Sequence, residues 1–326
     1  MRIRWAAGEN GATDRGLTIG NFDGVHLGHR NAIERLVAAS RARSLEPTAL
    51  LFDPHPLAVI APDKTPRRLT SIRARIDLLK RCGAAAVAVF EFDLDAAAME
   101  PETFVREVLV GALRARLVVA SREFRFGAGR RGDLATIERA GLDLGLDAIE
   151  APTVEESGGA VSSTRIRGLL ASGDVAAAAR LLGRPHSICG VVERGDGRGR
   201  TLGFPTANLG DVAEMAPAEG IYAAWARWGA SHHPAAVHVG RRVTFDDRFA
   251  VEAHVLGVNP DLYGRNLEIA FVERLRNNEM FDGPEVLAKQ IARDVRAAAG
   301  ILDGAPPGWT YPCPGHRGAA ESARAG

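Results

Sequence analysis

The chain is poor in lysine and cysteine and contains no long apolar run. Lysine occurs only at positions 64, 80 and 289, and the three cysteines are widely spaced. An odd number of cysteines without metal-ligand spacing makes a disulfide framework or a cysteine metal site implausible. No run of about 18 apolar residues could span a bilayer, and no apolar signal core follows Met1. We therefore expect a cytoplasmic protein without a membrane partner.

Charge of one sign is not in excess either. The chain has 41 basic and 40 acidic residues, a net charge of +1, so no global field attracts nucleic acid. Its apolar share of 46% and charged share of 25% are typical of a globular protein. Its 326 residues have room for two domains of about 100–200 residues each. We expect small-molecule ligands rather than nucleic acid, and a monomer or homo-oligomer.

Strand-like and helix-like segments alternate from Leu17 to about Leu182. Such alternation predicts a parallel sheet covered by helices on both faces, here a Rossmann-like α/β domain over residues 1–183. The expected strands lie at 17–19, 49–52, 85–90 and 117–120, and the expected helices at 32–37, 72–80, 101–113 and 133–144.

The pattern changes after Gly183, where short strand-like runs follow one another between turn-rich segments. Successive short strands predict a mainly antiparallel barrel, closed here by a helix from Pro284 to about Ala299. We assign residues 184–302 to this second domain and expect the tail 303–326, rich in Gly, Pro, Ala and Arg, to be disordered. The expected strands lie at 188–193, 221–228, 235–239, 249–256 and 267–272.

A His-x-Gly-His motif lies between the first predicted strand and its helix. His26 and His29 flank Gly28 at the predicted start of that helix. Backbone N–H groups and the dipole at a helix start favour an anion, and the imidazoles can donate to the same anion. The segment from Gly20 to His29 therefore predicts a binding site for nucleotide phosphates.

A second helix start carries hydroxyls and arginines. Ser162 or Ser163 is a natural N-cap, and Thr164, Arg165 and Arg167 follow it. Taken alone, the pattern also fits a capped helix with solvated arginines. Together with the first motif, it favours a clamp on the far side of a triphosphate.

The first motif recurs in nucleotidyltransferases and in class I aminoacyl-tRNA synthetases. The synthetases also need a lysine-rich Lys-Met-Ser-Lys-Ser loop, for which this chain has too few lysines. A nucleotidyltransferase is therefore favoured.

The second domain opens with a glycine-rich stretch that runs from Gly195 through Arg200 and Gly203 to Asn208. Its glycines would fit an ordinary hairpin loop as well as a lid over a nucleotide. Further along, Glu252 and His254 alternate with apolar residues on a predicted strand, so both point to the same face.

Several segments in fixed order resemble the bacterial bifunctional riboflavin kinase/FAD synthetase family. In the first domain these are Gly20–His29, Phe52–Pro56, Phe124–Gly127 and Ser162–Arg167; in the second, Gly-Arg-x-Leu-Gly-Phe-Pro-Thr-Ala-Asn ending at Asn208 resembles the riboflavin kinase signature. The resemblance implies that the second domain phosphorylates riboflavin to FMN with ATP. The first domain would then adenylylate FMN to FAD and release pyrophosphate.

The resemblance also implies roles for individual residues. At the adenylyltransferase site it implies phosphate and transition-state contacts from His26, His29 and Arg167, with Gly20, Asn21, Phe22, Asp23, Gly28, Phe124, Phe126, Ser163, Thr164 and Arg165 binding the ligands. At the kinase site it implies Glu252 as the base, Thr206 and Asn208 as holders of Mg²⁺ and ATP phosphates, and Gly195, Arg200, Gly203, Phe204 and Pro205 as ligand-binding residues. Hydroxyl and amide oxygens suit Mg²⁺. Phe124 and Phe126 could present a wall to an aromatic ligand or belong to the core.

The chain departs from the family pattern at Ser121 and Glu123 in the first domain and at His238 and Val243 in the second. The family has Asn at the position of His238 and Pro at the position of Val243. These changes leave an alternative in which only the adenylyltransferase is active and the second domain binds flavin or regulates. A non-catalytic flavin or nucleotide binder is a third possibility.

Overall fold

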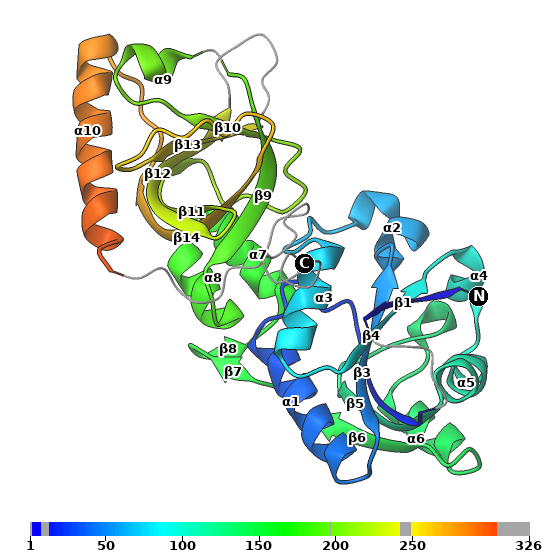
Figure 1. Cartoon of the computed structure of the whole chain (residues 1–326). Coiled ribbons are helices and arrows are strands. Elements are labelled where there is room, and N and C mark those ends of the chain that lie inside the picture. The colour runs from blue at the N-terminus through cyan, green and yellow to red at the C-terminus, as the bar shows by residue number, and fades with distance from the viewer. Residues whose placement is uncertain (1, 8–12, 196, 242–248, 305–326) are drawn as a thin grey trace, which may run out of the picture. The chain divides into compact units, whose positions relative to one another are not determined.

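The computed structural model describes residues 2–7, 13–195, 197–241 and 249–304 (Figure 1). The chain forms two compact units: Met1–Pro66 with Ile72–Ser162, and Arg67–Ser71 with Ser163–Gly326. Val243 and the predicted tail from residue 305 lie outside the described residues. Within the described part of the chain, no helix is both long and apolar enough to cross a membrane.

The first unit is built on a sheet in the order β1-β4-β3-β2-β5-β6. All neighbours pair in parallel except β1, which is antiparallel to β4. Its strands are β1 (Ile3–Ala7), β2 (Arg15–Ile19), β3 (Glu46–Asp53), β4 (Ala86–Glu91), β5 (Ala115–Ser121) and β6 (Asp147–Ala151). The order of the parallel strands reverses between β2 and β5, which is where open α/β sheets bind ligands at the carboxyl ends of their strands.

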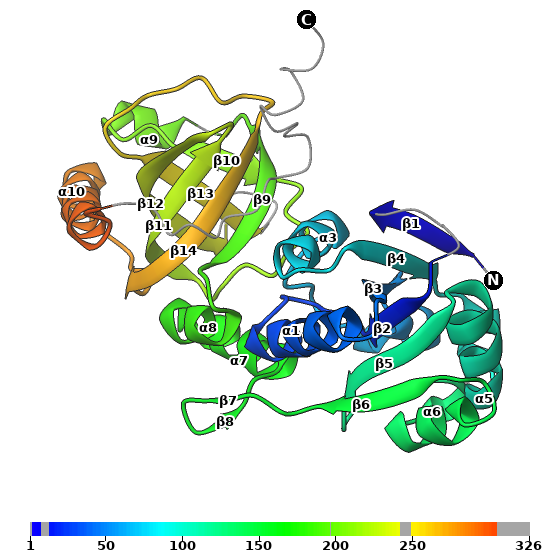
Figure 2. The ribbon, with the colours of Figure 1, turned by 60° about the horizontal axis from the view of Figure 1, so that its bottom comes forward.

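Helices cover both faces of this sheet, as the sequence predicts (Figure 2). They are α1 (Leu27–Arg41), α2 (Pro56–Ile60), α3 (Ile72–Arg81), α4 (Leu94–Ala98), α5 (Pro101–Thr103) and α6 (Leu134–Gly141), with short 3-10 turns at Pro62–Lys64 and Ala128–Arg130. Between α5 and β5 lies η2 (Phe104–Ala112), a π-helix, and a small hairpin pairs β7 (Glu155–Glu156) with β8 (Gly159–Ala160).

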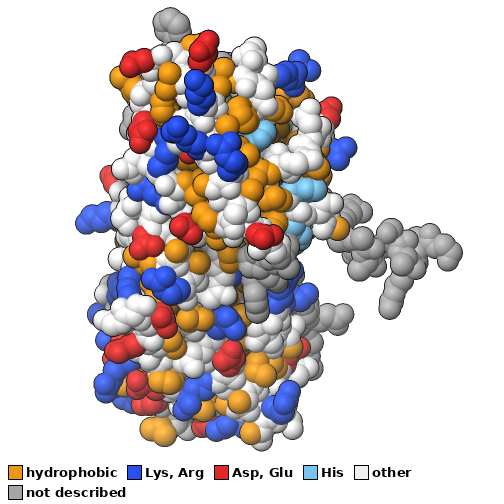
Figure 3. Space-filling view, turned by 90° about the vertical axis from the view of Figure 1, so that its left-hand side faces the viewer, with side chains coloured by type: hydrophobic (Ala, Val, Ile, Leu, Met, Phe, Trp, Pro, Cys, Tyr) orange, Lys and Arg blue, Asp and Glu red, His pale blue; other side chains and the backbone are white. Residues whose placement is uncertain are grey.

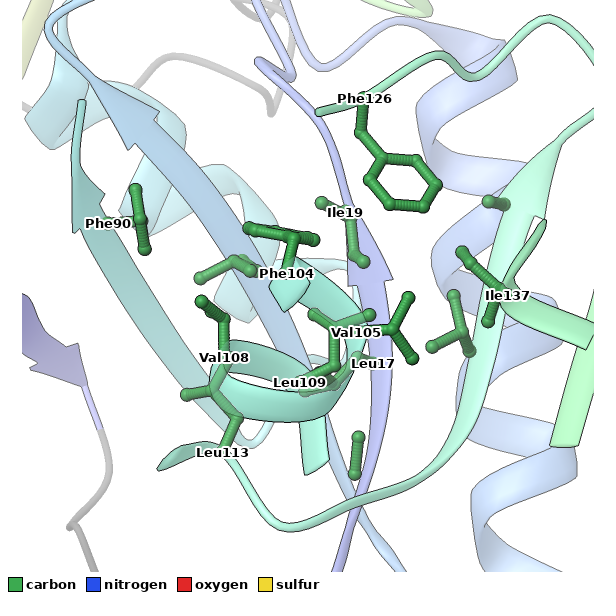
Figure 4. Packing of buried hydrophobic residues seen from close by; sticks show 14 of the residues in the cluster. Leu17, Ile19, Phe90, Phe104, Val105, Val108, Leu109, Leu113, Phe126 and Ile137 are labelled. Carbon is green, nitrogen blue, oxygen red and sulfur yellow. The ribbon is translucent and has the colours of Figure 1, made fainter. Parts of the chain in front are cut away.

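The residues of β5 alternate between two hydrophobic cores, because successive strand side chains point to opposite faces. Leu117 and Val119 pack with Leu36 of α1. Val118 and Ala120 belong to the opposite cluster, where Figure 4 shows Leu17 and Ile19 of β2 against Phe104, Val105 and Leu109 of η2. Both faces of the sheet are therefore buried.

The second unit is a closed antiparallel barrel in the order β10-β13-β12-β11-β14-β9 (Figure 2). Its strands are β9 (His186–Glu193), β10 (Ala207–Gly210), β11 (Gly220–Trp228), β12 (Ser231–Arg241), β13 (Phe249–Val255) and β14 (Asn266–Arg276). Its helices are α7 (Ser163–Ser172), α8 (Val175–Leu182), α9 (Arg198–Thr201) and α10 (Pro284–Ile301). The predicted barrel with a terminal helix is thus confirmed.

An ion pair ties α10 to the barrel. Arg276, the last residue of β14, donates from Nε and Nη2 to the Asp294 carboxylate at 3.0 and 2.8 Å. Gln290 donates to the same carboxylate at 2.9 Å. Because this network satisfies the half-buried guanidinium and the buried carboxylate together, it fixes the helix against the strand.

The two described cysteines differ in state, and the surface charges are mixed. Cys82 is free, whereas Cys189 is disulfide-bonded, a bond that the cysteine spacing did not predict. On the face drawn in Figure 3, basic and acidic side chains are interspersed rather than gathered by sign.

Candidate active sites

The Gly20–His29 loop leaves the carboxyl end of β2 in a constrained backbone conformation. Phe22 and Val25 have positive φ values of 48° and 40°. A positive φ is costly for a bulky or β-branched side chain, and such strain clusters at functional sites. Both side chains are almost fully buried, and Val25 N–H donates to the Phe22 carbonyl at 3.0 Å. Burial and this hydrogen bond therefore hold the loop in shape.

His26 and His29 lie together at the start of α1. His26 is the N-cap, and its Nδ1 accepts from the His29 N–H at 3.3 Å. The two rings stack with their centroids 3.6 Å apart. A Cβ on Gly28 would lie 3.2 Å from the His26 ring, so a side chain there would crowd the imidazole. The structure thus places two imidazoles at a helix start, where backbone N–H groups favour an anion.

A buried arginine of α3 holds this loop through Asp23 and Asn21. Arg75 of α3 lies 3.5 Å from the Asp23 carboxylate and donates to the Asn21 carbonyl at 3.1 Å. A buried guanidinium needs such partners to offset its desolvation. No sequence motif includes Arg75; its one signal is its place on the same helical face as Leu78 and Leu79.

The segment Phe52–Pro56 also reaches the loop. His55 caps α2 by accepting from the Leu57 N–H at 3.1 Å. Its other ring nitrogen lies 3.1 Å from the amide nitrogen of Asn21. The structure therefore brings this family segment and the first motif together.

Phe124 and Phe126 stack at 5.5 Å but differ in burial. Phe126 belongs to the hydrophobic core and contacts Phe104, whereas Phe124 is half-buried at its edge. Of the two rings, only that of Phe124 has exposed surface that a ligand could contact. Two nearby residues depart from the family pattern: Ser121 is the last residue of β5, and Glu123 is exposed.

The second phosphate motif forms the first turns of α7. Ser163, Thr164, Arg165 and Arg167 lie there together, and Arg167 Nε donates to the Arg67 carbonyl at 2.6 Å. This helix belongs to the second compact unit. Its part in the adenylyltransferase site stays a prediction.

A cavity of about 250 Å³ opens at the barrel. Arg200, Pro205, Thr206, Asp261 and Tyr263 are among its lining residues. Arg200 and Pro205, which are predicted to bind ligands, thus meet Thr206, a predicted Mg²⁺ ligand, at one hollow.

Two glycines of the Gly195–Asn208 stretch lie where a side chain has no room. A Cβ on Gly195 would lie 2.4 Å from the Asn208 amide nitrogen, and one on Gly199 would lie 2.4 Å from the Phe204 carbonyl oxygen. Gly203 has a φ of +86°, which favours glycine. Gly195 therefore lies directly against the side chain of Asn208.

His254 holds the end of this loop, a role that the sequence analysis did not assign. Its Nδ1 lies 2.8 Å from the Pro205 carbonyl oxygen, and its ring meets Phe204 edge-on at 5.5 Å. The sequence pattern that could have indicated this role is the alternation that places His254 on the same strand face as Glu252.

A row of polar residues crosses four neighbouring strands of the barrel. Asn208 of β10 is the register partner of Glu193 on β9 and of Glu252 on β13. Glu252 is in turn opposite His238 of β12, whose Nδ1 lies 3.9 Å from its carboxylate. Because register partners share a face, the proposed base lies beside a proposed Mg²⁺ ligand.

Family models match both units of the chain. Residues 9–165 match FAD synthetase and residues 182–302 match riboflavin kinase.

Relatives and a solved structure match most of the chain. The bifunctional riboflavin kinase/FMN adenylyltransferase of Escherichia coli (strain K12) is 40% identical over 280 residues, covering 85% of this chain and 90% of the relative. The enzyme of the same name from Bacillus subtilis (strain 168) is 32% identical over 290 residues, covering 86% and 90%. A crystal structure described as a macrolide-efflux protein from Streptococcus pneumoniae is 27% identical, with a TM-score of 0.81 over 94% of this chain and 97% of that one.

Both catalytic domains are therefore present in one transferase, which supports the two-activity interpretation over the adenylyltransferase-only alternative. The chain belongs to the bifunctional riboflavin kinase/FMN adenylyltransferase family.

Proposed function

We propose that riboflavin is phosphorylated at the polar row Asn208–Glu252 of the barrel and that FMN is adenylylated at the Gly20–His29 loop. The observation that carries this proposal is the register of β10 and β13, which puts Asn208 and Glu252 side by side on one face. The ligands are riboflavin, FMN, FAD and ATP, and we place the enzyme in the cytoplasm.

In the kinase reaction, a ribityl hydroxyl of riboflavin attacks the γ-phosphorus of ATP and must lose its proton. Glu252 is half-buried and carries a carboxylate that can accept this proton. The Gly195–Asn208 loop covers the phosphates and excludes water while the hydroxyl and phosphate are aligned.

The residues present fit Mg²⁺. The structure gives Thr206 a place on the cavity and turns the Asn208 amide toward Gly195, where a Cβ would fill the space. Among the described residues no group of three or more His, Cys, Asp or Glu could cage a metal, and Mg²⁺ commonly relies on few protein ligands plus substrate phosphates. Thr206 and Asn208 would hold the ion, which would neutralise charge on the ATP phosphates.

The adenylyl transfer needs no base, because the attacking FMN phosphate is already an anion near neutral pH, with a second pKa of about 6. It needs alignment and relief of repulsion between two polyanions. His26, His29 and the N–H groups of α1 supply donors in the first unit. For Ser163, Thr164, Arg165 and Arg167 of α7, the phosphate-binding role that the family resemblance implies stays a prediction.

Two variants test the kinase assignments, with FMN to FAD conversion measured in the same preparations as a control. Glu252→Gln should lower kcat for FMN formation by about 10²–10⁴ without changing FAD formation from FMN. Asn208→Ala should raise the Mg²⁺ concentration needed for half-maximal FMN formation, and chelation of Mg²⁺ should stop both reactions. Wild-type FMN formation by Glu252→Gln would show that Glu252 is not the base.

A further inference from the structure

The residue opposite the proposed base is His238. β12 places it directly across from Glu252 of β13, at a position where the family resemblance implies Asn. The two side chains are both about one-third exposed, at 36% and 33%, so they face the same partly open surface. Their atoms Nδ1 and Oε2 are 3.9 Å apart.

The second ring nitrogen of His238, Nε2, lies over Gly240. A Cβ on Gly240 would lie 2.7 Å from His238 Nε2 and equally 2.7 Å from the amide nitrogen of Asn278. Asn278 follows β14 and donates to the Val239 carbonyl at 3.2 Å. The imidazole is therefore confined between Glu252 and the segment after β14, and Gly240 provides the room it occupies.

We infer that His238 is a positioning residue for Glu252 in riboflavin phosphorylation, an inference that rests on the proposed role of Glu252 as the base. A glutamate on a strand can rotate about three side-chain bonds, and a base is effective only within hydrogen-bond reach of the proton it accepts. Asn208 borders Glu252 on one side and His238 on the other. A hydrogen bond from the His238 ring to the carboxylate would restrict this rotation.

The 3.9 Å separation is too long for a hydrogen bond, but it is within ion-pair range and closes with a small side-chain rotation. Catalytic hydrogen bonds are often long without substrate and shorten in its presence. The asparagine of the family pattern also ends in an N–H donor. His238→Asn therefore preserves the function that we assign to the imidazole, whereas His238→Ala removes it.

The test is a double-mutant cycle in the full-length enzyme. His238→Ala should lower kcat for riboflavin phosphorylation about tenfold, with KM for ATP changed less than twofold, and His238→Asn should restore most of kcat. In the Glu252→Gln background, His238→Ala should change the remaining rate less than twofold, because its effect passes through the carboxylate. The matched control is His233→Ala, a histidine of the same strand that stacks on Trp228 at 4.5 Å; its kcat should stay within twofold of wild type.

Each other outcome overturns the inference in a distinguishable way. Wild-type kcat in His238→Ala, or a tenfold loss that repeats in the Glu252→Gln background, shows that His238 does not act through Glu252. Failure of His238→Asn to recover shows that the N–H donor is not what matters. If Glu252→Gln itself keeps the wild-type rate, the proposed base is wrong and the positioning role falls with it.

Discussion

At the residue scale, the kinase loop depends on a glycine that leaves space for its neighbour. Gly195 is the first residue of the loop, and the amide of Asn208 occupies the space where a side chain on Gly195 would lie. Asn208 is almost fully buried, so its side chain cannot move aside into solvent. An added methyl group must therefore displace either the loop or the amide.

We predict that Gly195→Ala lowers riboflavin kinase activity about a hundredfold, the order expected for a displacement of about 1 Å at a reacting centre. FAD formation from FMN should stay at the wild-type rate. The matched control is Gly300→Ala in α10, where a Cβ meets nothing within 4 Å and both activities should be kept. Steady-state assays with riboflavin and with FMN measure the two effects; equal kinase rates for the two variants would contradict the steric account.

Residues that act through others were the hardest to predict from the sequence. The motifs identified His26, His29, Thr206 and Asn208 because each belongs to a compact pattern of glycines and polar residues. Arg75 and His254 lie far along the chain from the loops they support. Their partners are defined only when the sheet and the barrel close.

At the element scale, Glu214 ties the segment Arg67–Ser71 to the barrel unit. The backbones of Glu214 and Arg68 pair in an isolated parallel β-bridge, and Met215 N–H donates to the Arg68 carbonyl at 2.7 Å. Its carboxylate accepts from the Cys189 N–H at 3.4 Å. Burial raises the pKa of Glu214 above its ordinary value of 4.5, against the opposing effect of backbone hydrogen bonds, among them the one from Cys189, and of the Arg68 charge.

This shift predicts a pH-dependent stability. The folded state holds the Glu214 proton more tightly than the unfolded state, so stability falls as pH rises from about 4.5 through the folded pKa. Glu214→Gln cannot ionise and should gain about 2–4 °C in Tm over wild type at pH 8, with a smaller gain at pH 5. The exposed Glu273→Gln is the control. Thermal melts at both pH values measure this, and a larger gain at pH 5 would contradict it.

The periodic elements were predictable and the irregular ones were not. The predicted helix at 72–80 is α3 (Ile72–Arg81), because its apolar residues recur on one face. The predicted helix at 101–113 is instead α5 followed by the π-helix η2, a difference in hydrogen bonding that an apolar pattern does not encode. Strand β10 was missed because it has four residues and lies inside the glycine-rich motif.

At the scale of the whole molecule, the two predicted architectures are correct. The predicted domain boundary after residue 183 stays a prediction: α7 and α8 cluster with the barrel, whereas the riboflavin kinase model begins at residue 182. Leu170 of α7 accepts from the Ala218 N–H at 2.8 Å, and Arg274 donates to the Ser172 carbonyl at 3.3 Å. Local sequence patterns identify α7 as a helix, but its packing partners come from residues that are distant in sequence.

The central claim is that one chain performs two successive reactions at separate sites. The most direct measurement is a time course of the wild type and the variants Glu252→Gln and His29→Ala with Mg·ATP, in which the flavins are separated and quantified. From riboflavin, the wild type should form FMN and then FAD, Glu252→Gln almost no product, and His29→Ala FMN that accumulates. From FMN, Glu252→Gln should form FAD at the wild-type rate. Formation of neither FMN nor FAD by the wild type, or loss of both reactions in either variant, would contradict the account.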